Sequence, residues 1–334
     1  MPSTRHPKDP DALANGVLAG ERRALAKAIT LVESTTDTDR ALAGQLLQRL
    51  DGRDSVAMRI GLSGTPGVGK STFIEALGME LVGQGHRVAV LAVDPSSARS
   101  GGSILGDKTR MELLARHPAA FIRPSPSDGT LGGVARRTRE TIRLVEAAGF
   151  DVVIVETVGV GQSETLVAEM TDVFLLLLAP AGGDELQGVK RGIMEIADLI
   201  VVNKADGALK PIAETTRTDY ASALRLLRKR NADPEGFPTA LTVSSKTGDG
   251  VTALWEKISG LFRWRQEHDW IETRRAGQAG TAFDRSVEQI LLSALGSDTD
   301  MMEPLADLRA KASAGQIDPE AAATELVARF LKRG

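Results

Sequence analysis

The sequence predicts an α/β protein with a mostly parallel sheet covered by helices on both faces and helical extensions at both ends. Between about residues 57 and 258, short and almost continuously apolar runs alternate with helical patterns. Such runs are typical of parallel strands that are buried on both faces. Before and after this region the apolar residues follow a helical period only, which predicts the two extensions.

The N-terminal extension is expected to be helical over about residues 10–50. It begins with an Asp-Pro pair followed by apolar residues at helical spacing, and a second helical run, DTDRALAGQLLQRL, comes next. The expected strands after it are AMRIGLSG, VAVLAVDP, DVVIVET, VFLLLLAP, LIVVNKAD and TALTVSS.

After Gly260 the pattern is helical to the end of the chain. It includes FDRSVEQILLSAL and DPEAAATELVARFLKR, and the second begins with Asp318 as N-cap and Pro319 at the first helical position. These patterns divide the chain into an N-terminal extension (1–55), an α/β domain (56–260) and a C-terminal helical arm (261–334).

Composition limits the classes of function. The chain has 334 residues and a net charge of −3, which gives no support for nucleic-acid binding. It has no cysteine, which excludes disulfides and thiolate metal sites. The first residues, MPSTRHPKDP, lack the apolar core of a secretory signal, and the longest apolar run is too short to span a bilayer. We therefore expect a cytoplasmic protein with neither nucleic acid nor membrane as a partner.

The stretch GTPGVGKS matches the phosphate-loop pattern G-x-x-x-x-G-K-[ST], and it lies between an expected strand and an expected helix. Glycines let backbone N–H groups turn inward around a phosphate, and the helix N-terminus favours negative charge. Lys70 would reach the β- and γ-phosphates, and the Ser71 hydroxyl would bind Mg²⁺. The alternative is a plain glycine-rich turn. The pattern predicts a phosphate-loop NTPase whose nucleotide contacts are Gly64, Thr65, Pro66, Gly67, Val68, Gly69, Lys70, Ser71 and Thr72.

Two later loops indicate which base is bound. LIVVNKAD ends a strand with the N-K-x-D pattern, and the Asp206 carboxylate can accept two hydrogen bonds from guanine that adenine cannot offer. The stem of Lys204 can lie along the base, and Asn203 can tie the loops together. Alone, NKAD would often be an ordinary surface turn. The stretch TVSSKTG resembles the S-A-K loop of GTPases and adds three guanine-site residues, Ser244, Ser245 and Lys246.

Three acidic residues follow or lie near strand ends on the expected nucleotide side. Glu156 ends the run VVIVE, with Gly159 in the usual switch position. Asp94 ends VAVLAVD, and Asp107 lies in GGSILGDKTR. A carboxylate at such a position can hold Mg²⁺ directly or through water. For each of them the alternative is a helix cap or a solvated turn.

Several stretches together resemble the MeaB family, the G-protein chaperones of adenosylcobalamin-dependent methylmalonyl-CoA mutase. They are GTPGVGKSTFIEALG, VLAVDPSSARSGGSILGDKTRM, FIRPSPSDGTLGGVARRT, VIVETVGVGQSE and LLAPAGGDELQGVKRGIMEIADLIVVNKAD. The resemblance is close over roughly residues 55–260, and both helical extensions suit it. In that family ETVGVGQSE is the normal sequence, so Glu156 belongs to the family's own switch.

The resemblance implies a homodimer with C-terminal helical arms that binds the mutase. GTP binding and hydrolysis would control loading of the cofactor and limit the loss of damaged cofactor. Residues 94–110 would form a first switch and residues 156–164 a second. Residues 180–190 would be a further mobile segment, from which Lys190 could approach the phosphates; its alternative is a simple strand-to-helix loop.

The expected mechanism is phosphoryl transfer from GTP to water. Turnover should be slow without a partner, because Gln162 is displaced from the usual place of a water-positioning glutamine. The expected ligands are Mg²⁺ and GTP or GDP, with no tightly bound organic cofactor of the protein's own. The residues expected to act in catalysis are Lys70, Asp94, Asp107, Glu156 and Lys190. The expected metal ligands are Ser71, Asp94, Asp107 and Glu156.

Two other classes of function also use parts of this sequence pattern. A metallochaperone-type GTPase would want a Cys/His cluster, whereas the four histidines here are scattered. A small-molecule or protein kinase would also use a phosphate loop, but it needs an acceptor pocket and a base that the sequence does not reveal. The arm carries an apolar helical stripe, and we expect a second copy to cover it rather than the chain's own domain. The stripe residues are Phe283, Val287, Ile290 and Leu291.

Overall fold

The computed structural model describes residues 9–51, 57–93, 111–124, 131–157, 163–180 and 191–332. These residues belong to two compact units, Met1–Gln278 and Ala279–Gly334. Among the described residues, no helix is both long and apolar enough to cross a membrane.

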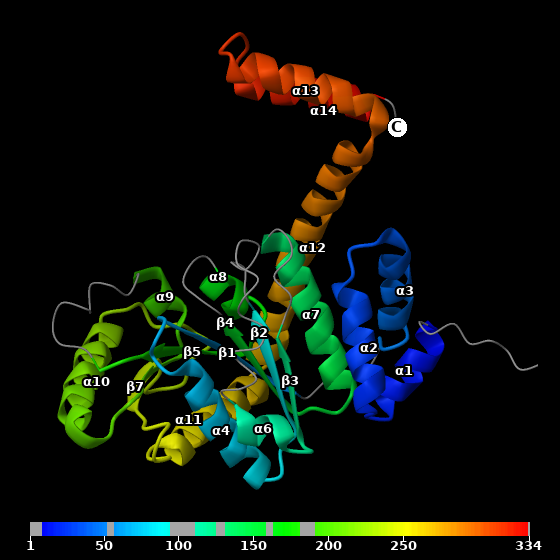
Figure 1. The fold of residues 1–334 in the computed structure, drawn as a ribbon. Helices are drawn as coiled ribbons and strands as arrows, with labels where there is room; N and C mark the ends of the chain where they lie inside the picture. Colours follow the sequence, from blue (N-terminus) through cyan, green and yellow to red (C-terminus); the bar gives the residue numbers. More distant parts are fainter. Residues whose placement is uncertain are drawn as a thin grey trace, which may run out of the picture. The chain divides into compact units, whose positions relative to one another are not determined.

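A seven-stranded sheet forms the centre of the first unit, and every strand pairing that the structure describes is parallel (Figure 1). The order is β3-β2-β4-β1-β5-β6-β7, so β1 lies in the middle, between β4 and β5. The strands are β1 Met58–Gly64, β2 Val88–Val93, β3 Ala120–Pro124, β4 Val152–Thr157, β5 Val173–Leu178, β6 Leu199–Val202 and β7 Thr239–Thr242.

Helices cover both faces of this sheet and make up the two extensions. The N-terminal helices are α1 Pro10–Leu18, α2 Arg22–Glu33 and α3 Asp37–Gln48. Between the strands lie α4 Lys70–Gly83, α6 Glu112–Arg116, α7 Leu131–Ala147, α8 Ser163–Ala168, α9 Arg191–Ile196, the short 3₁₀ helix η3 Gly207–Leu209 and α10 Lys210–Arg225. The C-terminal helices are α11 Val251–Glu267, α12 Trp270–Ser297, α13 Thr299–Ser313 and α14 Pro319–Leu331.

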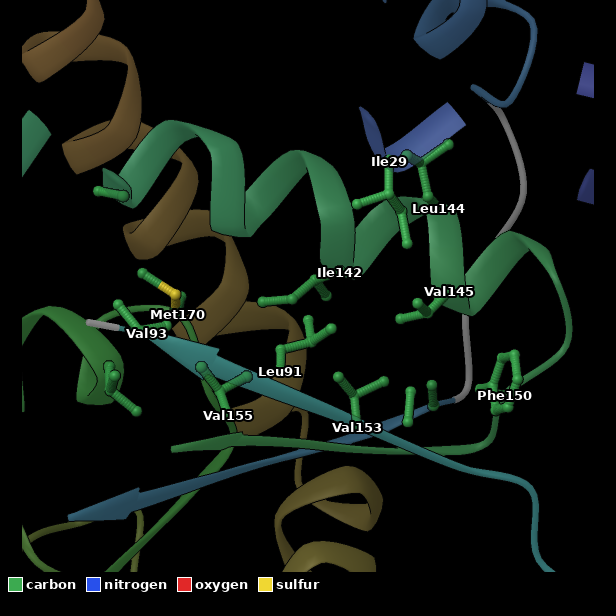
Figure 2. Close-up of a cluster of buried hydrophobic side chains, with 14 of the residues drawn as sticks. Ile29, Leu91, Val93, Ile142, Leu144, Val145, Phe150, Val153, Val155 and Met170 are labelled. Carbon is green, nitrogen blue, oxygen red and sulfur yellow. The ribbon is translucent and has the colours of Figure 1, made fainter. Parts of the chain in front are cut away.

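Alternation along the strands sends side chains into two separate cores, because successive strand residues point to opposite faces. On one face, Val153 and Val155 of β4 and Leu91 of β2 pack against Ile142 and Val145 of α7, as Figure 2 shows. The helices α1, α2, α3 and α8 contribute to this core too. On the other face, alternate residues of the same strands pack against α4 and α11. The expected α/β architecture is therefore confirmed, and the N-terminal helices belong to the same compact unit as the sheet.

Six of the seven strands are those that the apolar runs predict, but β3 was not predicted. This strand pairs only with β2, at the edge of the sheet, and it ends in Arg123 and Pro124. An edge strand needs no continuous apolar run, so periodicity gave no signal for it. The predicted N-cap of the last helix is confirmed, since an Asp318 carboxylate oxygen accepts hydrogen bonds from the backbone N–H groups of Glu320 and Ala321, both at 3.0 Å.

The compact units differ from the three-part division that the sequence suggested. The expected start of the arm, residue 261, lies inside α11, where Leu261 and Phe262 are buried in the core beside the sheet. The beginning of α12 is also fixed to the first unit, because the Gln278 side chain donates a hydrogen bond to the backbone oxygen of Thr171 over 2.8 Å. The boundary between the units therefore falls after Gln278.

A buried ionic network lies at the amino ends of β5 and β6, opposite the phosphate loop. Asp198 directly precedes β6, and its carboxylate is bonded by Arg265 of α11 over 2.6 Å and by Arg230 over 2.8 Å. Arg265 also reaches Asp233 over 2.7 Å. The three residues Asp198, Arg265 and Asp233 are almost completely buried. This network joins α11, and the segment between α10 and β7, to the sheet.

Candidate nucleotide-binding site

The phosphate loop leaves the carboxyl end of the central strand and enters α4. Ligands of open parallel sheets bind at such a carboxyl end, where the chain turns from one side of the sheet to the other. Gly67 and Gly69 have φ values of +81° and +92°, which only glycine adopts without strain. A β-carbon on Gly64 would lie 2.4 Å from the backbone oxygen of Leu177 in β5. The loop glycines are therefore required by backbone conformation and by close approach.

Lys70 is folded back over its own loop. Its ammonium group donates a hydrogen bond to the backbone oxygen of Gly64 over 2.6 Å and a longer one to that of Thr65 over 3.4 Å. Both acceptors belong to the loop that would surround the phosphates, so the charge lies where the β- and γ-phosphates would be held. Ser71 and Thr72 occupy the next positions, in the first turn of α4.

Asn203 connects the phosphate loop to both loops that the sequence assigns to the base. Its side-chain nitrogen donates to the backbone oxygen of Val68 over 3.0 Å. Its side-chain oxygen accepts from the backbone N–H of Ser245 over 3.1 Å and from the Ser245 hydroxyl over 2.6 Å. Asn203 is buried, so one side chain fixes three segments relative to one another.

The remaining residues of N-K-x-D are held in the same way. Lys204 has a φ of +58°, and its ammonium group donates to the backbone oxygen of Gly67 over 2.7 Å. The Asp206 carboxylate accepts a hydrogen bond from the buried Ser244 hydroxyl over 2.7 Å. Lys246 is exposed beside them. The Ser244 hydroxyl thus fixes the orientation of the Asp206 carboxylate, which is partly exposed.

Glu156 lies near the end of β4, opposite Leu62 of β1 and Ala92 of β2. Its strand neighbours Val152 and Ile154 face α4, so alternation places Glu156 on the same face as the helix that carries Ser71. Its side chain is almost completely buried. Serine and carboxylate oxygens are ligands that Mg²⁺ prefers, so this pair fits the ion. Within the described part of the chain, no group of three His, Asp or Glu side chains could hold a metal.

Comparison with known proteins identifies the family. A family model described as "Methylmalonyl Co-A mutase-associated GTPase MeaB" matches residues 25–300. The chain belongs to the MeaB family. A protein named "Putative GTPase" from Caulobacter vibrioides is 51% identical over 322 residues, which cover 96% of this chain and 98% of that protein.

Two further relatives support the membership of this MeaB-family chain. "Methylmalonic aciduria type A homolog, mitochondrial" from Mus musculus is 45% identical, with 97% of this chain and 80% of that protein covered. A solved structure named "LAO/AO transport system kinase" is 36% identical, has a TM-score of 0.76, and is matched over 98% of this chain and 99% of that one. The phosphate-loop fold is therefore confirmed, and the protein is a GTPase.

Several predicted site residues of this MeaB-family protein lie outside the described residues. They are Asp94, Asp107, Gly159 and Lys190, together with Gln162. The described site thus consists of the phosphate loop, Glu156 and the two base loops, which lie at the carboxyl ends of β1, β4, β6 and β7.

Several buried or partly buried residues that hydrogen-bond next to this site were not predicted from the sequence. Ser63 and Thr157 form a buried hydroxyl pair next to Gly64 and Glu156. Thr247 donates its backbone N–H to the Ser244 hydroxyl over 3.2 Å, which fixes the partner of Asp206. A signal existed for the pair, because Ser63 is a polar residue at the end of an apolar strand.

Proposed function

We propose that this MeaB-family GTPase hydrolyses GTP with Mg²⁺ and couples binding and hydrolysis to the loading of adenosylcobalamin into methylmalonyl-CoA mutase. The same cycle would protect the mutase from inactivation. One observation carries the nucleotide part: Asn203 and Lys204 tie the phosphate loop to the base loops, so both ends of GTP meet one preassembled site. The partner is supported by the printed description of the family.

The proposed catalytic roles of the phosphate loop and Glu156 rest on these positions, and those of Asp94, Asp107 and Lys190 rest on the sequence. Backbone N–H groups of the phosphate loop and Lys70 bind the β- and γ-phosphates and offset the charge that develops during transfer. Ser71 and Glu156 would hold Mg²⁺, which supplies further neutralisation of the phosphate oxygens. We propose that Asp94 and Asp107 help to hold the same metal ion and the attacking water. Lys190 would be a cation that the partner moves toward the phosphates. Water is the acceptor, and the products are GDP and phosphate.

The test is Mg²⁺-dependent phosphate release from GTP, with ATP as control, in the presence and absence of purified methylmalonyl-CoA mutase. We expect slow, GTP-specific turnover that the mutase accelerates, because a partner can complete the active site of a slow GTPase. A turnover rate that the mutase does not change would contradict the proposed partner but not the GTPase activity. Phosphate transferred to an added metabolite or protein would contradict hydrolysis as the function and favour a kinase.

Substitution of Asp206 by Asn is expected to weaken GTP binding about 100-fold. The carboxylate can accept hydrogen bonds from both the ring N–H and the exocyclic amine of guanine, and an amide cannot accept both. The side chain would stay in place, because Asn retains an oxygen that can accept the Ser244 hydrogen bond. Nucleotide affinity measured by fluorescence titration checks the loss.

Xanthosine triphosphate provides the control for this variant. Xanthine presents a carbonyl where guanine presents its exocyclic amine, so the introduced amide should bind it better than the Asp206 carboxylate does. We expect D206N to prefer xanthosine triphosphate over GTP. Unchanged GTP affinity in this variant would remove Asp206 from the base site.

We also propose that the protein is a homodimer joined through the second compact unit. Within that unit, α12 exposes large apolar side chains, including Phe283 at 68%, Ile290 at 61% and Leu292 at 69%. Phe283, Val287, Ile290 and Leu291 recur at helical spacing, which makes a stripe that needs a partner surface.

The double substitution Phe283→Glu/Ile290→Glu is expected to convert the dimer into monomers, because two charges would be buried without partners at the interface. Sedimentation velocity at micromolar concentration measures the mass. Glu288→Lys, an exposed charge change on another side of the same helix, is the control and should remain dimeric. A double variant that sediments like the unmodified protein would contradict this interface.

A further inference from the structure

Two buried hydroxyl groups lie at the roots of the phosphate loop and of the expected second switch. Ser63 directly precedes Gly64, and Thr157 directly follows Glu156 at the end of β4. Thr157 Oγ1 donates a hydrogen bond to Ser63 Oγ over 3.1 Å, and the two residues are 0% and 2% exposed. Inside the core, this bond joins the two strand ends from which the functional loops leave the sheet.

The register shows how the pair is related to Glu156. Leu62 of β1 pairs with Glu156 of β4, so Ser63 and Thr157 come next on their strands. Thr157 follows the side-chain direction of Val153 and Val155, toward the core beneath α7 and α8, while Glu156 points to the α4 face. The Thr157 hydroxyl therefore holds the residue next to Glu156 from the opposite side of the sheet.

Packing alone does not require hydroxyl groups here. Val155 and Leu176 lie on the same face and are buried apolar residues, and a valine has nearly the volume of a threonine. A buried hydroxyl is unfavourable unless it is hydrogen-bonded, and the bond then has a preferred length and direction that apolar contact lacks. A hydroxyl pair at this place fixes the positions of the two strand ends more narrowly than an apolar pair would.

We propose that Ser63 and Thr157 are positioning residues for GTP hydrolysis, whose hydrogen bond sets the placement of Glu156 relative to the phosphate loop. The inference rests on the proposed role of Glu156 at the metal. It identifies Thr157 as the residue near the start of the expected second switch that is held in the core of the sheet. Small displacements of groups that act in catalysis lower rates strongly even when binding is unaffected.

The test compares Thr157→Val with Thr171→Val. Thr171 is also completely buried beneath the same face, but its hydroxyl bonds to the backbone oxygen of Val167 over 2.9 Å and joins no functional loop. We expect kcat for GTP hydrolysis to fall about 10-fold in T157V and to change less than about twofold in T171V. GDP affinity should be unchanged in both, because the phosphate and base loops stay intact. Thr157→Ser, which retains the hydroxyl, should recover most of the rate.

Ser63→Ala provides the second variant, should T157V be poorly folded at the assay temperature. It removes the same hydrogen bond from the other strand, so its kcat should fall to a similar extent. The double variant S63A/T157V should be no slower than either single variant, because one shared interaction is lost only once. Equal kcat values in T157V and T171V, or losses in the double variant that multiply, would overturn the inference.

A parallel measurement on Glu156→Gln separates this inference from the function on which it rests. Full hydrolysis by E156Q would remove Glu156 from the site and overturn its proposed role, and the positioning inference would fall with it. Loss of hydrolysis in E156Q, together with equal rates in T157V and T171V, would overturn the positioning role alone.

Discussion

Substitution of Arg265 by Met is expected to lower the free energy of unfolding by about 3–5 kcal/mol, the usual effect of breaking a buried ion pair from one side. The Arg265 guanidinium is 2.6 Å from an Asp198 oxygen and 2.7 Å from an Asp233 oxygen. It also donates to the backbone oxygen of Asp172 over 2.7 Å. Methionine fills much of the same volume, but it removes one of the two arginines that pair with the Asp198 carboxylate and leaves Arg230 and the backbone N–H of Phe174 as its partners.

Urea unfolding followed by circular dichroism measures this effect. Arg263→Met is the matched control, because Arg263 lies in the same helix and is exposed. Its substitution should change the unfolding free energy by less than about 0.5 kcal/mol, as exposed substitutions usually do. Similar losses in the two variants would show that α11 is not held by the buried network.

The same variant should show a distinct pH dependence. Burial by itself raises the pKa of the Asp198 carboxyl, but the charges of Arg265 and Arg230 outweigh burial and hold that pKa below its usual range. A lowered pKa in the folded protein stabilises it in full above the unfolded value of about 4, and this contribution is lost as the pH falls further. The difference between the original protein and R265M should therefore shrink below about pH 4. An equal difference at pH 7 and pH 3 would contradict the role of Asp198.

This network also shows where prediction from the sequence ends. Arg265 and Asp198 are far apart in the chain and belong to different elements. A helical period tells which face of α11 is buried, but it does not tell which carboxylate a buried arginine will meet. The helical period also does not tell where the arm separates from the domain: the sequence predicted a boundary at residue 261, whereas α11 and the first turns of α12 belong to the first unit.

The central strands and the phosphate loop were predictable because their signals are local. Strands buried on both faces need continuous apolar runs, and a loop that turns around phosphate needs glycines at particular positions. The hydrogen bonds that hold the phosphate loop in place were harder to predict. The sequence allowed a tie by Asn203, but its acceptor in the structure is a backbone oxygen, that of Val68, which no side-chain pattern records.

Substitution of Glu156 by Gln should reduce kcat for Mg²⁺-dependent GTP hydrolysis by about 1,000-fold, in the range seen when a charge-stabilising group is removed. Gln has the same shape as Glu, so the buried position on the α4 face stays filled and the fold is retained. The neutral amide, however, is a poor ligand for a hard divalent ion. GTP affinity should fall far less than kcat, since the phosphate loop and both base loops are unaltered.

Phosphate release measured over a range of Mg²⁺ concentrations tests this expectation, and E156Q should need more Mg²⁺ for half-maximal rate. Glu75→Gln is the control: Glu75 lies one turn into α4, and its carboxylate accepts a hydrogen bond from the backbone N–H of Leu113 over 2.7 Å. Glu75→Gln should leave kcat within about twofold of the value for the unmodified protein, because the Glu75–Leu113 hydrogen bond joins two helices and does not involve the nucleotide loops. A large loss in both variants would mean that any change of charge near α4 disturbs the loop. A large loss in E156Q alone, with a shifted Mg²⁺ requirement, would place Glu156 at the metal, since only a carboxylate at the ion links the two observations.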